Sequence, residues 1–193
     1  MFISYEQTEK EAQSFLTKYH PSFSVPVPIE RIVEIDLQIS IVPIKGLLVR
    51  ESIDAFLSCD FTELYIDHDH YMGQTNRSRF TLAHEVGHYV LHRDVVAQIT
   101  SIEQLRRFIL GEGTGRAVYE IHADNFAGCL LMPRDQVRAE YDIQKKTVED
   151  RFRSARLEIP DKSTLVSFMA NEIARKFDVS PKAAEIRLSK VST

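Results

Sequence analysis

The sequence is poor in the features that mark secreted and membrane-bound proteins. It contains only two cysteines among 193 residues, Cys59 and Cys129, and both lie in apolar surroundings without the spacing of metal-binding cysteines. We expect two reduced thiols in a cytoplasmic protein. The N-terminus moves directly into a charged amphipathic pattern, so we expect no signal peptide, and no apolar run approaches the length of a membrane span. No membrane partner is therefore expected.

Glycine is also scarce, with seven residues, and three of them alternate in the segment 111–115, after a predicted helix over 101–110. The glycine segment does not end in Gly-Lys-Ser/Thr and does not connect a strand to a helix, which excludes a phosphate-binding loop. It is either a plain turn between helices or a flexible lid near a cleft.

The charge is unevenly distributed along the chain. Residues 1–133 carry 11 Lys and Arg against 18 Asp and Glu, a net charge of −7, while residues 134–193 carry 13 against 10, a net charge of +3. Together these give the net charge of −4 for the whole chain. The shift after Pro133 predicts two units, a domain over 1–133 and a basic module over 134–193.

The segment 80–92 contains the pattern His-Glu-x-x-His inside an apolar stretch that favours a helix. Residues four apart lie on one face of a helix, about 6 Å apart along its axis, so His84 and His88 can direct ring nitrogens at one metal ion. Glu85 lies beside them, where its carboxylate can act as general base on a water molecule. The pattern is typical of zinc hydrolases and predicts zinc as the cofactor.

Catalytic zinc usually has three protein ligands, so the two histidines need a third partner. His92 is a poor choice, because it lies about 12 Å along the helix axis from His84 and cannot converge on the same ion. A histidine at the helix end that serves packing is the better interpretation of His92.

The segment 119–133 predicts a second buried helix, which ends at a proline. Glu120 and Asp124 are four residues apart and share one face of this helix. We predict that Glu120 completes the set of metal ligands and that Asp124 accepts the remaining ring N–H of a ligand histidine. His122 lies two positions off this face and stays open as an alternative ligand. Without the histidine motif, an exposed acidic pair would be the default interpretation.

Apolar periodicity along the rest of the chain predicts an α+β fold. Helices are expected over 5–19 and 29–35 and from about 75–78 onward, and strands over 38–43, 55–60 and 63–67. A small mixed sheet followed by the two site helices is a zincin-like arrangement of a metallopeptidase domain. An edge strand beside the metal would let an extended peptide pair with it, but the sequence does not say which strand that is.

The C-terminal part predicts a small helical module similar to helix-turn-helix. An apolar helix over 165–176 precedes a tight turn, and the next helix has Ser180 as its N-cap and Pro181 as its first residue. DNA binding is one interpretation of this module. Three basic side chains would then contact phosphates: Lys182, Arg187 and Lys190. A net charge of +3 is weak for that role, so we favour packing or partner docking.

Three segments resemble the ImmA/IrrE group of zinc metallopeptidases, and they occur in that group's order. They are RFTLAHEVGHYVLH at 79–92, EIHADNFAGCLLMP at 120–133 and FDVSPKAAEIRL at 177–188. Weaker similarity extends back through 25–36 and the strand-like stretches, so most of the chain is covered.

This resemblance implies a metal site and a catalytic residue at named positions. The implied metal ligands are His84, His88 and Glu120, and the implied catalytic glutamate is Glu85. The group often has Glu where this chain has His122 and Asn where it has Asp124. An aspartate still accepts a hydrogen bond, so Asp124 keeps its predicted role.

Two functions from different classes are compatible with the sequence. The first is a zinc-dependent endopeptidase that, like its relatives, cleaves a helix-turn-helix transcriptional repressor at one site and so derepresses genes. The second is a non-enzymatic regulator in which the zinc fold is structural and the C-terminal module binds DNA or a protein. Glu85 favours the enzyme, because a structural zinc site needs no general base and closes its fourth position with protein.

Overall fold

The computed structural model describes residues 3–73, 75–101, 103–104, 107–108 and 116–191. The glycine segment 111–115 lies outside these residues, and so does half of the predicted helix over 101–110. None of the helices in the described part combines the length and the apolar character that a membrane span needs.

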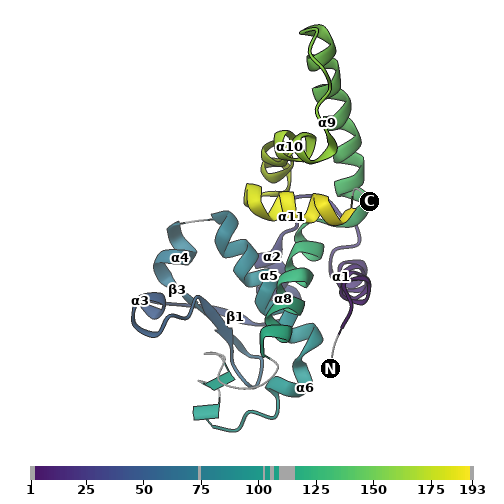
Figure 1. Cartoon of the computed structure of the whole chain (residues 1–193). Coiled ribbons are helices and arrows are strands. Elements are labelled where there is room, and N and C mark those ends of the chain that lie inside the picture. Colours follow the sequence, from purple (N-terminus) through teal and green to yellow (C-terminus); the bar gives the residue numbers. More distant parts are fainter. Residues whose placement is uncertain (1–2, 74, 102, 105–106, 109–115, 192–193) are drawn as a thin grey trace.

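The described residues form helices and three short strands (Figure 1). In chain order these are α1 (Tyr5–Tyr19), α2 (Ile29–Arg31), the π-helical turn η1 (Ile32–Asp36), β1 (Ser40–Ile44), α3 (Leu47–Glu51), β2 (Ala55–Leu57), β3 (Glu63–Asp67), α4 (His68–Gly73), α5 (Thr75–Leu91), α6 (Arg93–Val96), α8 (Arg116–Leu131), α9 (Arg134–Ser154), α10 (Lys162–Phe177) and α11 (Pro181–Val191). The prediction of an α+β fold is confirmed.

Helix α1 has the bounds that its apolar stripe predicts. Ser4 and Gln7 form a capping box: the Ser4 hydroxyl accepts the Gln7 N–H at 3.2 Å, and the Ser4 N–H donates to the Gln7 side chain at 2.9 Å. The buried face of α1 packs on α8, where the rings of Phe15 and Phe126 meet edge to face with centroids 6.0 Å apart. The N-terminal helix thereby covers one side of α8.

The sheet is small and mixed, as predicted, with the strand order β1-β3-β2. Strand β1 pairs parallel to β3, and β2 pairs antiparallel to β3, so β2 is an edge strand. The predicted strand over 55–60 is too long, because a turn begins at Ser58. In this turn the Asp60 carboxylate accepts hydrogen bonds from Ser58 and Thr62, and Phe61 has a φ of 60°.

The core between the two long central helices is tightly packed. Helices α5 and α8 lie side by side between the sheet and α1 (Figure 1). Leu82, Ala83 and Phe126 are fully buried between them. Gly87 allows the closest approach, because a Cβ at this position would lie 3.0 Å from Ala123 Cα and 3.2 Å from the Ala123 carbonyl oxygen. Both neighbours belong to the α8 backbone, which cannot move aside without shifting the helix.

Gly87→Ala should therefore destabilise the protein. We expect a loss of about 1–3 kcal/mol in the free energy of unfolding, as is usual for overpacking, despite the better helix propensity of alanine. Gly128→Ala in α8 is the matched control, because a Cβ there meets nothing within 4 Å. That change should be neutral or stabilising in urea denaturation. Equal stability of the two variants would contradict the tight contact between α5 and α8.

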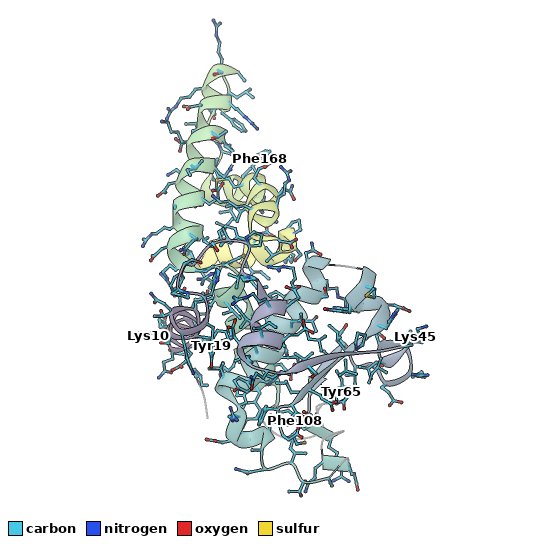
Figure 2. All side chains as sticks on the ribbon, turned by 180° about the vertical axis from the view of Figure 1, so that it is seen from behind. Lys10, Tyr19, Lys45, Tyr65, Phe108 and Phe168 are labelled. Carbon is cyan, nitrogen blue, oxygen red and sulfur yellow. The ribbon has the colours of Figure 1, made fainter. Side chains whose placement is uncertain are left out.

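The C-terminal residues fold into α9, α10 and α11, with α9 extending away from the rest of the molecule in Figure 1. Figure 2 shows Phe168 on this helical part and Phe108 at the opposite end of the molecule. The predicted cap of the last helix is confirmed, because Ser180 Oγ accepts the Ala183 N–H at 3.1 Å and Pro181 is the first helical residue. The helix-turn-helix character of this part stays a prediction.

The side chain of Arg187 points into the protein and is only 2% exposed. Its guanidinium donates to the Met132 carbonyl at 2.9 Å and to the Glu9 carboxylate at 2.6 Å. It also bonds the Tyr5 hydroxyl and contacts Cys129 Sγ at 3.3 Å. The prediction that Arg187 contacts phosphate is therefore wrong. A buried cation needs a carboxylate partner, and Glu9 of α1 supplies it.

Both cysteines are free thiols in the structure. Cys129 is buried, and burial raises the pKa of its thiol. Cys59 is partly exposed, and burial again raises its pKa. The expectation of two unbridged cysteines is confirmed.

Candidate metal centre

Two neighbouring helices bring the predicted site residues together. Helix α5 carries His84, Glu85 and His88 within one turn, and α8 carries Glu120 opposite them. The close approach of the helices at Gly87, between Glu85 and His88, lets a carboxylate on α8 reach both histidine rings.

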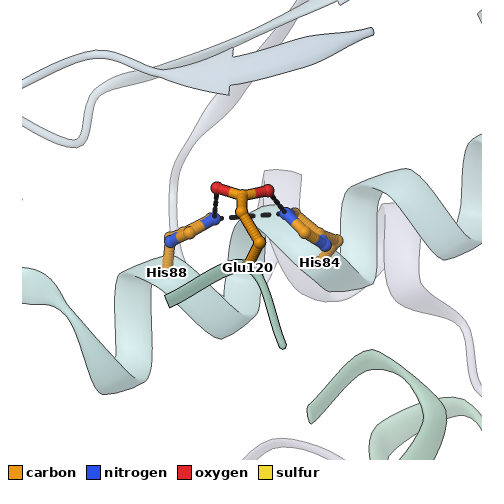
Figure 3. Close-up of side chains that lie close together, drawn as sticks. All are labelled: His84, His88 and Glu120. Atoms are coloured by element: carbon orange, nitrogen blue, oxygen red, sulfur yellow. Dashed lines mark hydrogen bonds and ion pairs between the residues drawn. The ribbon is translucent and has the colours of Figure 1, made fainter. Parts of the chain in front are cut away.

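Three side chains of the kind that binds metal ions converge in the structure (Figure 3). His84 Nε2 and His88 Nε2 are 3.1 Å apart, Glu120 Oε2 lies 3.3 Å from His84 Nε2, and Glu120 Oε1 lies 3.5 Å from His88 Nε2. Atoms bound tetrahedrally to zinc at about 2.0–2.1 Å lie about 3.3–3.4 Å from one another. The spacing of the three side chains is therefore close to that of zinc ligands, with each oxygen of Glu120 facing one histidine.

Asp124 is positioned to fix the ring of His84. Its carboxylate lies 2.9 Å from His84 Nδ1, where it accepts the Nδ1–H and keeps Nε2 directed toward Glu120. Burial alone would lower the pKa of His84, but hydrogen bonds to Asp124 and Glu120 outweigh it and raise this pKa to about 10. Burial would raise the pKa of Glu120, yet His84 and His88 hold it well below its usual range. This local excess of negative charge suits a cation.

Glu85 is nearly buried, with 7% of its surface exposed, and lines the same cavity as the three converging side chains. The cavity has a volume of about 290 Å³. One wall is the segment 52–57, which contains β2, and Phe108 lies on the wall near His88. The ring centroids of Phe108 and His88 lie 6.2 Å apart, in an edge-to-face arrangement.

His92 and His122 do not join the convergent set. His92 lies at the end of α5 as predicted, where it caps α6, and its Nδ1 is 3.0 Å from Nδ1 of His88. This is the ring nitrogen of His88 that points away from Glu120. His122 Nε2 accepts the Ile3 N–H at 3.1 Å and is buried against the N-terminus. The sequence did not reveal the contact between His88 and His92, although their i, i+4 spacing allows it.

Burial, together with His88 and His122, lowers the pKa of His92 to about 3, so its ring is neutral and offers a lone pair to the His88 N–H. We expect His92→Phe, which keeps a ring but removes this acceptor, to weaken zinc affinity by about 10–100-fold, as loss of an outer partner usually does. Chelator competition measures the effect. His20→Phe changes a buried histidine far along the chain that bonds Ser24, and it should leave zinc affinity unchanged. Wild-type zinc affinity in His92→Phe would show that the contact of His92 with His88 does not support zinc binding.

A second cluster beside the cavity was not singled out from the sequence. The buried ring of His70 lies 3.2 Å from Asp54 Oδ1 through Nδ1 and 3.1 Å from Thr81 Oγ1 through Nε2. Asp54 also pairs with Arg77 at 3.1 Å. Thr81 lies three residues before His84 on α5, and this spacing was the only sequence signal for its position at the cavity wall.

The fold and the site define a class: an α+β protein in which two adjacent helices hold a His-His-Glu set able to bind a metal ion. Residues 68–189 match the model of the IrrE N-terminal-like domain, the family Peptidase_M78. The match covers more than half of the chain, and the chain belongs to this family of peptidases. It confirms the resemblance to the ImmA/IrrE group, and it extends across the proposed boundary at Pro133.

One solved structure similar to this protein is described as a Mycobacterium tuberculosis transcriptional regulator. The similarity covers 97% of this chain and 47% of that chain, with a TM-score of 0.58 and 15% sequence identity. At this identity the likeness shows the fold alone, and this chain spans about half the length of that protein. No curated protein matches the sequence.

Proposed function

We propose that the protein is a zinc-dependent endopeptidase. His84, His88 and Glu120 hold the zinc ion, and Asp124 orients the ring of His84. The observation that carries the proposal is the convergence of three side chains, with Glu85 in the same cavity. The Nε2 atoms of His84 and His88 lie 3.1 Å apart, and they lie 3.3 and 3.5 Å from the two carboxylate oxygens of Glu120. This arrangement leaves the open side that a catalytic zinc site needs.

A zinc ion held there would supply a Lewis acid that polarises the scissile carbonyl. Glu85 takes the proton from the attacking water and passes it to the nitrogen of the leaving group. The nearly buried position of Glu85 keeps bulk water away from this proton transfer. Asp124 holds the Nδ1 proton of His84, so the opposite nitrogen keeps its lone pair during turnover.

Strand β2 is suited to hold the substrate backbone. It is the edge strand of the sheet on the side of α5, and its residues line the cavity that contains Glu85 and the three ligands. An extended peptide can pair with such an edge through main-chain hydrogen bonds. In this proposal the polypeptide substrate lies across the mouth of the cavity, and β2 is the edge strand that pairs with it.

The substrate that we propose is a helix-turn-helix transcriptional repressor, cut at one exposed segment. Membership in the Peptidase_M78 family supports a protein substrate, and the similar solved structure is itself described as a transcriptional regulator. That description also favours the second candidate, a regulator that uses the metal fold structurally and binds DNA or a partner. The presence of Glu85 in the cavity favours the peptidase.

Incubation of the zinc-loaded protein with casein and with the repressor encoded nearest to its gene tests this function. Gel analysis should show one cut in the repressor and no degradation of casein. A Glu85→Gln sample run in parallel identifies cleavage by contaminating proteases. Rapid digestion of casein without preference for the repressor contradicts the specific peptidase, and an intact repressor leaves the regulator as the better assignment.

A further inference from the structure

One face of α11 carries an exposed apolar side chain between two lysines. Lys182, Ile186 and Lys190 follow one another at intervals of four residues, so they lie on the same side of the helix. The surface of Ile186 is 52% exposed, and the side chain of Lys182 is 76% exposed. The Glu185 carboxylate accepts a hydrogen bond from Ser167 of α10 at 3.2 Å and pairs with Lys182 at 3.2 Å. Two lysines against one carboxylate leave this face with a net positive charge.

This face forms a wall of a groove of about 560 Å³ between α11, α5 and α8, which we call the α11 groove. Phe80, Ala183 and Ile186 give it an apolar lining. The groove shares wall residues with the metal cavity: Asp54, Phe80, Thr81 and Asp124. A bound polypeptide that extends from the metal cavity over α5 therefore enters the α11 groove directly.

The charges along this path change sign. At the end shared with the metal cavity are the carboxylates of Asp54 and Asp124, bound to Arg77 and His84 respectively. At the α11 end are Lys182 and Lys190. Nucleic acid fits this path poorly, because the apolar lining offers nothing to phosphates and the carboxylates repel them. A polypeptide with an apolar side chain followed by acidic residues matches both the lining and the charges.

The junction of the two cavities is built rigidly. Thr81 and Asp54 are held by the two nitrogens of the buried His70 ring, which ties α5 to the segment preceding β2. A wall residue fixed by a buried partner keeps its polar atom in one place, which suits a hydrogen bond to a passing main chain. The proposed function does not otherwise use this cluster.

We propose that the α11 groove is a binding site for the substrate segment next to the scissile bond. The segment places an apolar residue against Ile186 and acidic residues against Lys182 and Lys190. The bound segment is a substrate only if the proposed peptidase function holds. Binding of a peptide with apolar and acidic residues does not itself require hydrolysis. The helical C-terminal part is then a recognition element for polypeptide.

The test is a selection of random 12-residue peptides, displayed on phage, against the full-length zinc-loaded Glu85→Gln protein. Enriched peptides should combine an apolar residue with Asp or Glu. Fluorescence anisotropy should show that the Lys182→Glu/Lys190→Glu variant binds them at least about 10-fold more weakly, and that Ile186→Asp does so as well. The control with equal charge change is Lys145→Glu/Lys146→Glu on α9, which should bind like the parent. Surface variants are preferred to truncation, because α10 and α11 contribute buried residues to the common core.

Enriched peptides without acidic residues, affinities unchanged by the two lysine changes, or a selection that enriches no peptide would each overturn the inference. Duplex DNA is included as a competitor. Displacement of the peptide by DNA in the parent but not in the lysine variant would assign the groove to nucleic acid instead. The proposed function is tested separately: peptide binding without any cleavage by the wild-type protein would leave the groove standing and remove the peptidase.

Discussion

Wild-type protein purified without chelator should contain about one zinc ion per chain, and His88→Ala should contain almost none. The variant keeps only two of the three converging side chains, His84 and Glu120, and two protein ligands hold zinc far more weakly than three. Metal content by mass spectrometry measures the result. His68→Ala removes a partly exposed histidine on α4 and should keep the full zinc content.

Full retention of zinc in His88→Ala would show that the cluster in Figure 3 is not the metal site. We expect His88→Ala to lose zinc and remain folded. Circular dichroism distinguishes this loss of a ligand from loss of zinc through unfolding. Zinc loss in the His68→Ala control would point to nonspecific binding.

Glu85→Gln should slow peptide cleavage by at least about 100-fold while zinc content stays at the wild-type level. A glutamine is nearly the same size but cannot take a proton from water, and the loss of a general base typically costs 10²–10⁴-fold in rate. Single-turnover cleavage of the identified substrate measures the rate. Because Glu85 is not one of the three converging side chains, its replacement separates chemistry from metal binding.

Glu149→Gln makes the same chemical change on α9, where the side chain pairs with Lys145 and Arg153, and its rate should match the wild type. Wild-type cleavage by Glu85→Gln would remove Glu85 from the role of base. Loss of zinc in that variant would instead move Glu85 into the coordination shell.

The parts of the structure that could be predicted from the sequence are those that depend on short-range geometry. The four-residue spacing of His84 and His88 already fixes both rings on one face, whatever surrounds the helix. The same argument placed Glu120 and Asp124 on one face of α8, and the structure brings both to His84. Their roles as ligand and orienting residue stay predictions that zinc measurements will decide.

The parts that the sequence did not foretell depend on contacts between distant segments. Arg187 looked like an exposed cation because its buried partner, Glu9, lies 178 residues earlier in the chain. The contact of His92 with His88 depends on side-chain rotamers that helical spacing leaves free. The α11 groove likewise requires the relative placement of three helices, which periodicity along each helix does not encode.

The buried pair of Glu9 and Arg187 also bears on how the chain is made. In the folded protein Glu9 pairs with Arg134 and with Arg187 of α11. Glu9 leaves the ribosome early, so of these two cations only Arg134 can reach it until α11 has been synthesised. Translation proceeds at about 5–20 residues per second, so α1 waits on the order of ten seconds for its second partner. Helix α1 packs on α8, which carries Glu120, so the ion pair between α1 and α11 adds its contribution beside the metal-site helix only after α11 has been made.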